Sequence, residues 1–441
     1  MTPHGPAPED YARRRRELLA TLDGAVLCIP PVPESIYSND VGYRYRPDSN
    51  TRYLSGFEDP AALVLAGHAG DERGFTLCVE ERDERSETWT GRREGLEGAR
   101  DRYGADHAHP LDRWVDVLTG HLREADRFYY APGRDDEANR RVFDAVAAVN
   151  RERPRSGRPS LAIDDAAALV AERRWRKDDV ELQLMRRAAT ITADAHCRLM
   201  ETLRPGQFEY QAEALLEHGF RHGGCAGPAY GSIVAAGANA TVLHYTRNDC
   251  PVESGQVLLV DAGGEFGGYC ADLTRTIPAD ATFESGAAAV YDVVLDAQAA
   301  ALAKVAPGGT LDAVHDAAVD VLCDGLVRLG IAGGSAAECK ESGAYRTFYM
   351  HNTSHWLGMD VHDVGDYRRD GVARPLEPGA VLTVEPGLYI RTDAEVPERY
   401  RGVGVRIEDD VVVTADAGEV LTDAAPKTRP DIEKLRAAAF A

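Results

Sequence analysis

The stretch LLVDAGGEFGGYCADLTRT, residues 258–276, places two aspartates where a core hairpin is expected. An apolar run ends in Asp261, glycines follow, and a second run begins around Asp272. Strands normally exclude aspartate, which fits poorly on a pleated and half-buried surface. If the strands pair across a turn between Phe266 and Gly267, the two carboxylates face each other, with Cβ atoms about 5 Å apart. Two buried carboxylates this close repel each other unless one is protonated or a cation bridges them, so we expect a metal ion.

The same pattern occurs a second time along the chain. GQVLLVDAG (residues 255–263) and GAVLTVEPG (residues 379–387) share their glycines, their Val-Leu-x-Val run and the position of an acid. A second strand with another acid follows each copy. Chance similarity between two valine-rich strands is the alternative, but the matching acids favour two copies of one supersecondary unit. The four acids are Asp261, Asp272, Glu385 and Glu408.

Three histidines, His351, His355 and His362, lie close together in FYMHNTSHWLGMDVHDVG, residues 348–365. A single histidine is more often a packed or surface residue than a ligand, but three beside glycines favour a functional site. His355 and the four acids would form an oxygen-rich site with one imidazole. Carboxylates suit Mn²⁺ or Mg²⁺, and an imidazole admits Co²⁺, Fe²⁺ or Zn²⁺. Bridging acids can hold two ions about 3.5–4 Å apart.

The order of apolar patterns predicts two domains. Strand-like runs such as AALVLAGH (residues 61–68) and FTLCVE (residues 75–80) alternate with helical runs such as RRVFDAVAAVN (residues 140–150). From Trp175 the pattern changes to long helices, the first of which begins after an N-cap at Asp178 or Asp179. We expect an α/β domain over residues 1–174 and a second domain over residues 175–441. Two further helices are predicted over residues 287–305 and 311–329.

Composition excludes several classes of function. The formal net charge of −22 over 441 residues argues against nucleic-acid binding, which needs a basic surface. The start of the chain lacks the apolar segment of a secretory signal, and no long uncharged apolar run predicts a membrane span. The eight cysteines form no CxxC pair, which excludes zinc ribbons and suggests reduced thiols in the cytoplasm. The basic run Arg13–Arg16 is predicted to be the solvated face of a first helix.

Five motifs together resemble aminopeptidase P, the Xaa-Pro aminopeptidase of the pita-bread metallopeptidases. Its N-terminal domain is matched more weakly by YRYRPDSNTRYLSGFEDPAALVL, residues 43–65. The resemblance implies an N-terminal α/β domain followed by a C-terminal α+β pita-bread domain whose halves are related by a pseudo-twofold axis. The motifs are HYTRND (residues 244–249), DAGGEFGGYCADLTRTIP (261–278), HNTSHWLGMDVHDVG (351–365), LTVEPGLYI (382–390) and RGVGVRIEDDVVVT (401–414).

The resemblance also implies the metal ligands. Asp261 would chelate one of two divalent ions, and Asp272 and Glu408 would bridge both. His355 and Glu385 would complete the coordination of the other ion. Manganese is the expected metal, with cobalt and zinc as alternatives. Glu385 would also take a proton from the attacking water and pass it towards the leaving nitrogen.

Residues around the ligands are implied to handle the substrate. His244 matches a substrate-binding histidine, and His362 matches the histidine that steadies the tetrahedral intermediate. His351 and Arg406 match residues of the pocket, and Tyr389 matches a tyrosine near the metals. Asp40, in the short motif SNDVGYRYR, would reach the site from the N-terminal region.

Two neighbours of Asp272 are expected to have supporting roles. Thr274 and Cys270 share its strand parity. Thr274 would donate a hydrogen bond to a ligand carboxylate, and Cys270 would only pack in the core. The glycine-rich stretch GGCAGPAYGSIVAAGANA, residues 223–240, lacks the pattern of a phosphate loop, and we expect strands and turns lining the cleft.

The expected function is removal of the N-terminal residue from peptides with proline at the second position. A prolidase, which splits Xaa-Pro dipeptides with the same ligand set, is the alternative. A methionine aminopeptidase is disfavoured because those enzymes are usually shorter. A catalytically inactive pita-bread binding module is a remote alternative, because all five ligand positions are filled. The resemblance further implies a homo-oligomer, a dimer or a tetramer, with no nucleic-acid or membrane partner.

Overall fold

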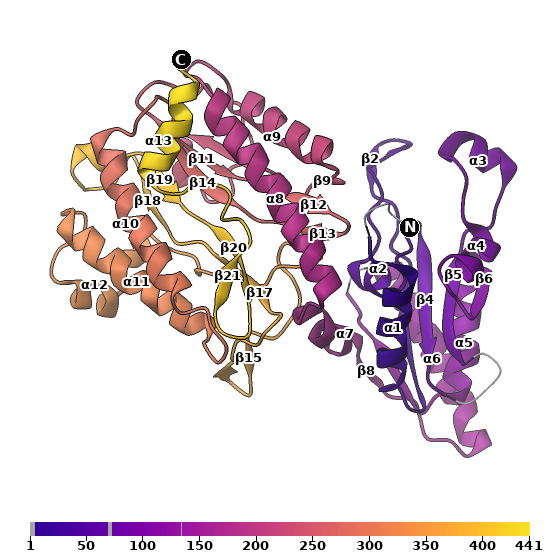
Figure 1. Cartoon of the computed structure of the whole chain (residues 1–441). Coiled ribbons are helices and arrows are strands. Elements are labelled where there is room, and N and C mark those ends of the chain that lie inside the picture. The colour runs from indigo at the N-terminus through magenta and orange to yellow at the C-terminus, as the bar shows by residue number, and fades with distance from the viewer. Residues whose placement is uncertain (1–4, 69–72, 134) are drawn as a thin grey trace. The chain divides into compact units, whose positions relative to one another are not determined.

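The computed structural model describes residues 5–68, 73–133 and 135–441, and the chain divides into two compact units, Met1–Arg173 and Arg174–Ala441 (Figure 1). Each unit has its own buried apolar core. Within these described ranges, we find no helix that is both long and apolar enough to span a membrane.

Unit 1, Met1–Arg173, is an α/β domain whose central sheet contains both parallel and antiparallel strands. The runs AVLCI, AALVLA and GFTLCV are buried at every position, as expected for strands covered on both faces. Described strands in sheet order are β6 (His107–Pro110), β5 (Gly74–Val79), β4 (Ala61–Ala66), β1 (Ala25–Ile29), β7 (Arg127–Tyr130) and β8 (Ile163–Asp165). A separate hairpin consists of β2 (Ile36–Ser38) and β3 (Val41–Gly42). The helices are α1 (Pro8–Leu19), α2 (Ser49–Ser55), α3 (Glu84–Thr90), α4 (Gly95–Asp101), α5 (Trp114–Glu124), α6 (Asp136–Glu152) and α7 (Ala166–Trp175), whose last two residues belong to unit 2.

The basic run lies in a first helix as predicted, and Arg16 is exposed, but the prediction of a solvated face is wrong for the middle of the run. Arg14 and Arg15 are buried. The guanidinium carbon of Arg14 lies 4.3 Å from the ring centroid of Tyr53, and that of Arg15 lies 4.2 Å from the ring centroid of Phe75. Arg15 also donates to the carbonyl of Leu54 at 2.8 Å. An arginine can be buried in this way because its planar cation stacks on rings while its N–H groups donate to carbonyls.

Unit 2, Arg174–Ala441, combines long helices with short antiparallel strands. The predicted cap of the first helix is confirmed, because the side chain of Asp178 accepts from the backbone N–H of Glu181 at 2.9 Å. The helices are α8 (Asp179–Thr202), α9 (Glu209–Gly223), α10 (Ser285–Leu302), α11 (Leu311–Arg328), α12 (Ala336–Ser342) and α13 (Arg429–Ala438). In Figure 1, α8 lies beside α9 and α10 beside α11.

The strands of unit 2 form the two copies predicted from the sequence. In each copy an outer pair of strands encloses an inner hairpin, and the acids lie where the outer pair meets the hairpin. The first copy contains β11 (Val257–Asp261), β12 (Gly264–Phe266), β13 (Tyr269–Cys270) and β14 (Thr274–Pro278). The second contains β17 (Val381–Val384), β18 (Gly387–Ile390), β19 (Val403–Arg406) and β20 (Asp409–Val413). The remaining strands are β9 (Gly227–Pro228), β10 (Ile233–Ala236), β15 (Arg368–Arg369), β16 (Val372–Ala373) and β21 (Gly418–Val420).

The register of the first copy differs from our prediction by one residue at the turn. Phe266 pairs with Tyr269, so the two-residue turn is Gly267–Gly268. Both glycines have positive φ, 58° and 93°, which a tight hairpin of this hand requires at its two central positions. Asp261 therefore pairs with Thr274 rather than with Asp272. Asp272 lies two residues before Thr274, which still places it on the same face of the hairpin as Asp261.

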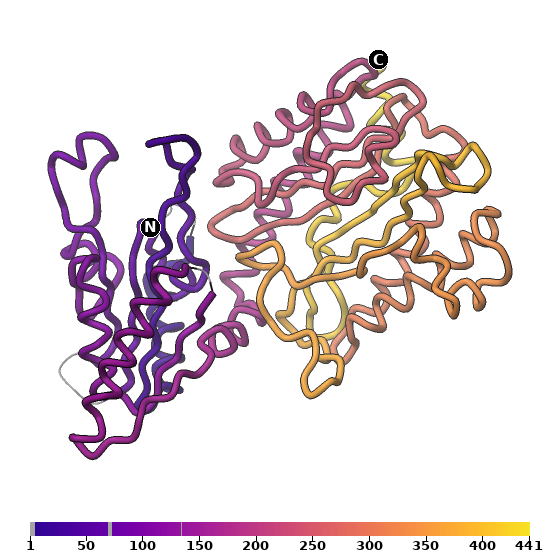
Figure 2. The backbone as a smooth tube through the Cα atoms, turned by 180° about the vertical axis from the view of Figure 1, so that it is seen from behind, coloured from indigo at the N-terminus to yellow at the C-terminus, as the bar shows by residue number. Residues whose placement is uncertain are grey.

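The two copies are joined along one edge of each. The hydroxyl of Thr276 donates to the carbonyl of Arg406 at 3.0 Å, and the N–H of Glu408 donates to the carbonyl of Thr274 at 3.1 Å. In Figure 2 the backbone near residues 255–280 runs beside that near residues 400–410, as it does in Figure 1. This junction brings the carboxylates of both copies into one place.

The backbone of Gly263 lies so close to the backbone of Ala271 that the first copy has no room for a side chain at position 263. A Cβ atom there would lie 1.8 Å from the carbonyl oxygen of Ala271, next to Asp272. We expect Gly263→Ala to lower the free energy of unfolding by about 2–3 kcal/mol, because backbone must move to relieve the clash. Urea unfolding measures this effect. Gly227→Ala is the control, because a Cβ at Gly227 meets nothing within 4 Å, and an equal loss in both variants would contradict the prediction.

Candidate metal centre

Ligand atoms of Asp272, His355 and Glu408 lie within 4.8 Å of one another. His355 Nε2 lies 3.4 Å from Asp272 Oδ2 and 3.5 Å from Glu385 Oε1. Asp272 precedes β14, Glu385 follows β17 and Glu408 precedes β20. The pairs that flank Glu385 and Glu408 in β17–β20 and β18–β19 place these two residues opposite each other. The two hairpins and the loop that carries His355 thus bring their donors to one point.

Tyr230 is a site residue that the sequence analysis missed. Its hydroxyl lies 2.6 Å from Asp261 Oδ1 and 2.5 Å from Asp272 Oδ1. This contact joins the two aspartates, although they do not pair directly in the hairpin. Tyr230 lies in the glycine-rich stretch that we predicted to line the cleft, but no pattern of acids or histidines marked it as part of the site.

The ring of His355 is oriented by its backbone surroundings. Nδ1 lies 3.0 Å from the carbonyl oxygen of Trp356, so this nitrogen carries the proton and Nε2 is left to face the acids. The hydroxyl of Thr383 accepts from the N–H of His355 at 3.1 Å and donates to Glu385 Oε1 at 3.2 Å. One threonine therefore fixes both members of the predicted ligand pair.

The positive charge of Arg406 lies beside Asp261 of the first copy. Its Nη2 donates to Asp261 Oδ2 at 2.5 Å, and its Nη1 donates to the hydroxyl of Tyr389 at 2.9 Å. Tyr389 is also 2.8 Å from Nε2 of His351. Three of the side chains predicted to surround the ligands, His351, Tyr389 and Arg406, are thus connected in one chain of hydrogen bonds that ends at Asp261.

His351, Arg406 and the predicted ligands line a cavity of about 540 Å³. His355 and His362 meet there edge to face, with ring centroids 4.5 Å apart. Leu243, Ile233 and Val361 give the wall an apolar part. Tyr389 is buried behind the wall. Predicted site residues that line the cavity are Asp261, Asp272, His355, Glu385, Glu408, His244, His351, His362 and Arg406.

Asp40 lies in the other unit. It is exposed in the turn between β2 and β3, next to Asn39, whose φ of 49° is left-handed. Its predicted role at the site stays a prediction.

The electrostatics of the cluster call for cations. Burial and the neighbouring carboxylates raise the pKa of Glu408 well above its usual range, and burial raises the pKa of Glu385 to about 7. Burial would lower the pKa of His355, but its contacts with Asp272 and Glu385 outweigh this and raise it to about 9. These four carboxylates carry more negative charge than Arg406 and His355 together can balance, so ionisation of all four needs further positive charge. An oxygen-rich donor set with one imidazole therefore fits divalent metal ions.

Comparison with known proteins also points to a metalloenzyme. The profile described as metallopeptidase family M24 matches residues 183–415. The chain belongs to metallopeptidase family M24. The profile of the aminopeptidase P N-terminal domain matches residues 11–130 of this M24 chain.

Relatives of known structure or name cover nearly the whole M24 chain. The Xaa-Pro aminopeptidase of Escherichia coli is 39% identical over 98% of each chain. The structure of Pseudomonas aeruginosa aminopeptidase PepP is 45% identical, covers 99% of each chain and has a TM-score of 0.95. A variant of Escherichia coli aminopeptidase P in complex with substrate is 40% identical over 99% of each chain, with a TM-score of 0.94. The predicted family, fold class and metallopeptidase activity are confirmed.

Thr274 donates to a carboxylate of the predicted ligand set, as expected. Its hydroxyl donates to Glu408 Oε2 at 2.6 Å and accepts from Arg406 Nε at 3.2 Å. Cys270 packs as predicted: it is buried, with Sγ 3.4 Å from the carbonyl oxygen of Met359.

We expect Thr274→Val to weaken metal affinity or kcat/KM by about 10- to 100-fold, because an oriented carboxylate loses its donor. Metal titration and steady-state kinetics measure this effect. Thr274→Ser keeps the hydroxyl and should restore most of both values. A serine variant as impaired as the valine variant would show that packing, and not the hydrogen bond, is what matters.

Proposed function

We propose that this chain is a dinuclear metal-dependent Xaa-Pro aminopeptidase that hydrolyses the bond between an N-terminal residue and a following proline. The observation that carries the proposal is the shared cavity: five metal-ligand candidates lie in it together with His244, His351, His362 and Arg406. The printed names of the relatives point to the same activity. Asp261, Asp272, His355, Glu385 and Glu408 would hold the two ions.

Bound divalent ions would supply a water of lowered pKa and positive charge near the scissile carbonyl. Glu385 would accept the proton of that water and deliver it to the leaving nitrogen, a role for which Thr383 already orients its Oε1 at 3.2 Å. His362 lies against His355 and lines the cavity, so it would donate a hydrogen bond to the oxyanion.

Recognition of proline follows from its chemistry. A proline nitrogen has no hydrogen, so the pocket cannot select it through an N–H contact. It must instead accept a compact apolar ring, for which Leu243, Ile233 and Val361 provide apolar surface. His244, His351 and Arg406 would hold the peptide groups beyond the ring. The leaving group is then a tertiary amide nitrogen that needs the proton from Glu385.

Further parts of the proposal rest on the family resemblance. We propose manganese as the physiological metal, although a zinc-substituted structure is known for Escherichia coli aminopeptidase P with product. We also propose a homo-oligomer in the cytoplasm in which Asp40 reaches a substrate site. Light scattering tests the assembly, and a mass of one 47.9 kDa chain would contradict it.

The deciding experiment compares peptides under metal control. Chelator-treated protein is incubated with an Xaa-Pro-Xaa tripeptide or an Xaa-Pro dipeptide, with and without Mn²⁺, Co²⁺ or Zn²⁺. Metal-dependent release of the first residue from the tripeptide supports the proposal. A preference for the dipeptide would assign a prolidase instead. No cleavage of either peptide with any of the metals would overturn both assignments.

A further inference from the structure

The loop that carries His244 has little regular structure of its own. We define the His244 loop as residues 237–250; it contains the 3₁₀ helix Gly237–Thr241 and then irregular backbone. Leu243, His244 and Thr246 from this loop line the cavity. His244 itself is exposed, so packing does not fix its position. The contacts that hold the two ends of the loop must therefore determine where His244 lies.

One carboxylate holds both ends. Oε1 of Glu209 accepts from the N–H of Ala236 at 2.8 Å and from the side-chain amide of Asn239 at 2.9 Å. Oε2 accepts from the hydroxyl of Tyr245 at 2.8 Å and from the N–H of Cys250 at 2.9 Å. Glu209 has 0% exposed surface. Two donors lie at the start of the His244 loop, and the other two lie after His244.

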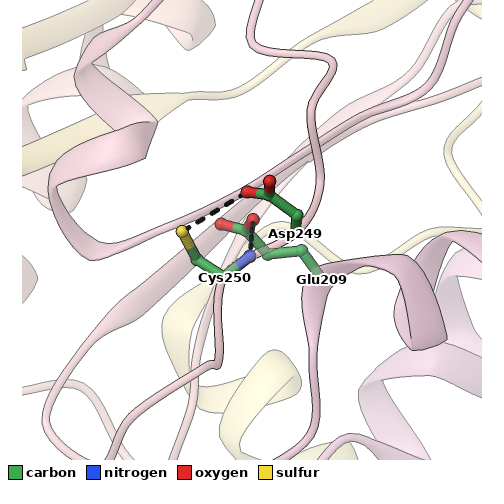
Figure 3. Close-up of side chains that lie close together, drawn as sticks. All are labelled: Glu209, Asp249 and Cys250. Carbon is green, nitrogen blue, oxygen red and sulfur yellow. Dashed lines mark hydrogen bonds between the residues drawn. The ribbon is translucent and has the colours of Figure 1, made fainter.

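Glu209 also lies close to Asp249 and Cys250, and the three residues together resemble a metal site (Figure 3). The hydrogen bonds of these three residues argue against metal binding there. Each oxygen of Glu209 already accepts two hydrogen bonds, which fills the acceptor sites of a carboxylate. Asp249 accepts from Arg247 at 2.7 Å. Figure 3 shows the thiol of Cys250 directed to Asp249, while its backbone N–H contacts Glu209.

All four donors to Glu209 are neutral, so its charge is stabilised by convergent dipoles rather than by a cation. Its place as the first residue of α9 adds the favourable end of the helix dipole. The N–H of Glu209 also donates to the carbonyl of Cys250 at 2.9 Å, which closes a reciprocal pair. Such a site fixes the direction of each donor as well as its distance.

We propose that Glu209 is a positioning residue for substrate binding, which acts by fixing the His244 loop against the cavity. The proposal rests on the substrate-binding role of His244 in the proposed function. Glutamine at this position keeps the shape but presents an NH₂ group to two of the four donors, leaving them without an acceptor. The loop then loses part of its attachment and keeps the contacts of buried Asn248 with Val234 and Ser232, so His244 is held less firmly.

Kinetics and hydrogen exchange of Glu209→Gln test the proposal on the metal-loaded full chain. For an Xaa-Pro-Xaa peptide, we expect kcat/KM to fall by about 10- to 100-fold, mainly through a higher KM, as for a misplaced binding group. The amide of Ala236 or that of Cys250 should exchange faster, because the two donate to different oxygens of Glu209 and glutamine keeps only one of them.

Glu181→Gln is the matched control. Glu181 is a buried glutamate in the first turn of α8 that accepts from the hydroxyl of Tyr269 at 2.9 Å and makes no contact with the His244 loop among its described hydrogen bonds. The Glu181→Gln variant should be less stable than the unmodified protein, but its KM should be unchanged. If Glu209→Gln does not fold, Tyr245→Phe removes a single donor and should show a smaller rise in KM.

A double-mutant cycle separates positioning from general stability. In a His244→Ala background, Glu209→Gln should cost less than about 3-fold further in kcat/KM, because the group it positions is gone. An equal loss in both backgrounds, or unchanged exchange at both Ala236 and Cys250, would overturn the proposal. If the unmodified protein cleaves no Xaa-Pro peptide, the proposed function has failed, and the exchange data alone decide whether Glu209 holds the loop.

Discussion

Glu408→Gln should lower kcat/KM by at least about 1,000-fold and should remove metal from the site. Glu408 is the buried carboxylate that meets Asp272 and His355, and it would bridge both ions. A neutral amide is a poor ligand for a hard divalent cation, and loss of several kcal/mol of charge stabilisation gives a rate effect of this size. The hydrogen bond from Thr274, 2.6 Å long, can still be accepted by the amide oxygen, so local structure should persist.

The same substitution should not destabilise the metal-free protein. Burial and nearby carboxylates raise the pKa of Glu408, which means that its ionised form is disfavoured there. A neutral glutamine removes that repulsion. Added Mn²⁺ should raise the melting temperature of the unmodified protein, because it binds only the folded state, but not that of Glu408→Gln.

Metal analysis, steady-state kinetics and thermal melting with and without Mn²⁺ measure these effects. Glu181→Gln serves as the control with a buried glutamate outside the site. A Glu408→Gln variant that retains the full metal content and activity would remove this residue from the ligand set. A variant that loses activity but melts much lower without metal would show that Glu408 is needed for folding instead.

The sequence predicted most of the charged residues that line the cavity, because local patterns mark them. Aspartate and glutamate in valine-rich strands contradict strand propensity, and such a conflict marks function. The repeat of the pattern around Asp261 and Glu385 predicted which strands would meet. Histidines clustered between glycines completed the set.

The rest of the site could not be predicted because it depends on register and long-range contacts. The turn at Gly267–Gly268 moved the partner of Asp261 by two residues, from Asp272 to Thr274, which pattern alone does not resolve. Tyr230 reaches the aspartates from a stretch with no acid or histidine. Glu209 looks like an ordinary first-turn helix acid, and its four donors come from residues far along the chain. The burial of Arg14 likewise depends on rings that only the fold brings near.

Asp363→Ala should lower the free energy of unfolding of unit 2 by about 3–5 kcal/mol, the cost of removing one partner from a buried ion pair. Asp363 Oδ1 lies 2.5 Å from Nη2 of Arg174, and its Oδ2 lies 3.0 Å from Nζ of Lys177. The side chains of these three residues are each 1% exposed. The alanine would leave two buried cations with Asp360 as the nearby acid, 2.7 Å from Arg174.

Asp363→Ala should also lower catalytic activity. Asp363 follows His362 directly, and its N–H donates to the carbonyl of Trp356 at 2.9 Å, beside His355. The ion pairs therefore hold the loop that carries two of the site's histidines. We expect the melting temperature to fall by roughly 10 °C and kcat/KM to fall by at least about 10-fold below that temperature.

Glu419→Ala is the matched control for Asp363→Ala, because Glu419 also pairs with an arginine, Arg186, at 2.8 Å. That pair is about half exposed, with side chains 43% and 44% accessible, so its removal should cost less than about 1 kcal/mol. Urea unfolding and kinetics on both variants make the comparison. Equal losses would mean that burial does not strengthen the pairs of Asp363.

A triple replacement, Arg174→Met, Lys177→Met and Asp363→Leu, should recover much of the stability, because none of these three side chains then carries a buried charge. It should not recover activity to the same extent, since the hydrogen bonds and ion pairs that orient the His362 loop would still be missing.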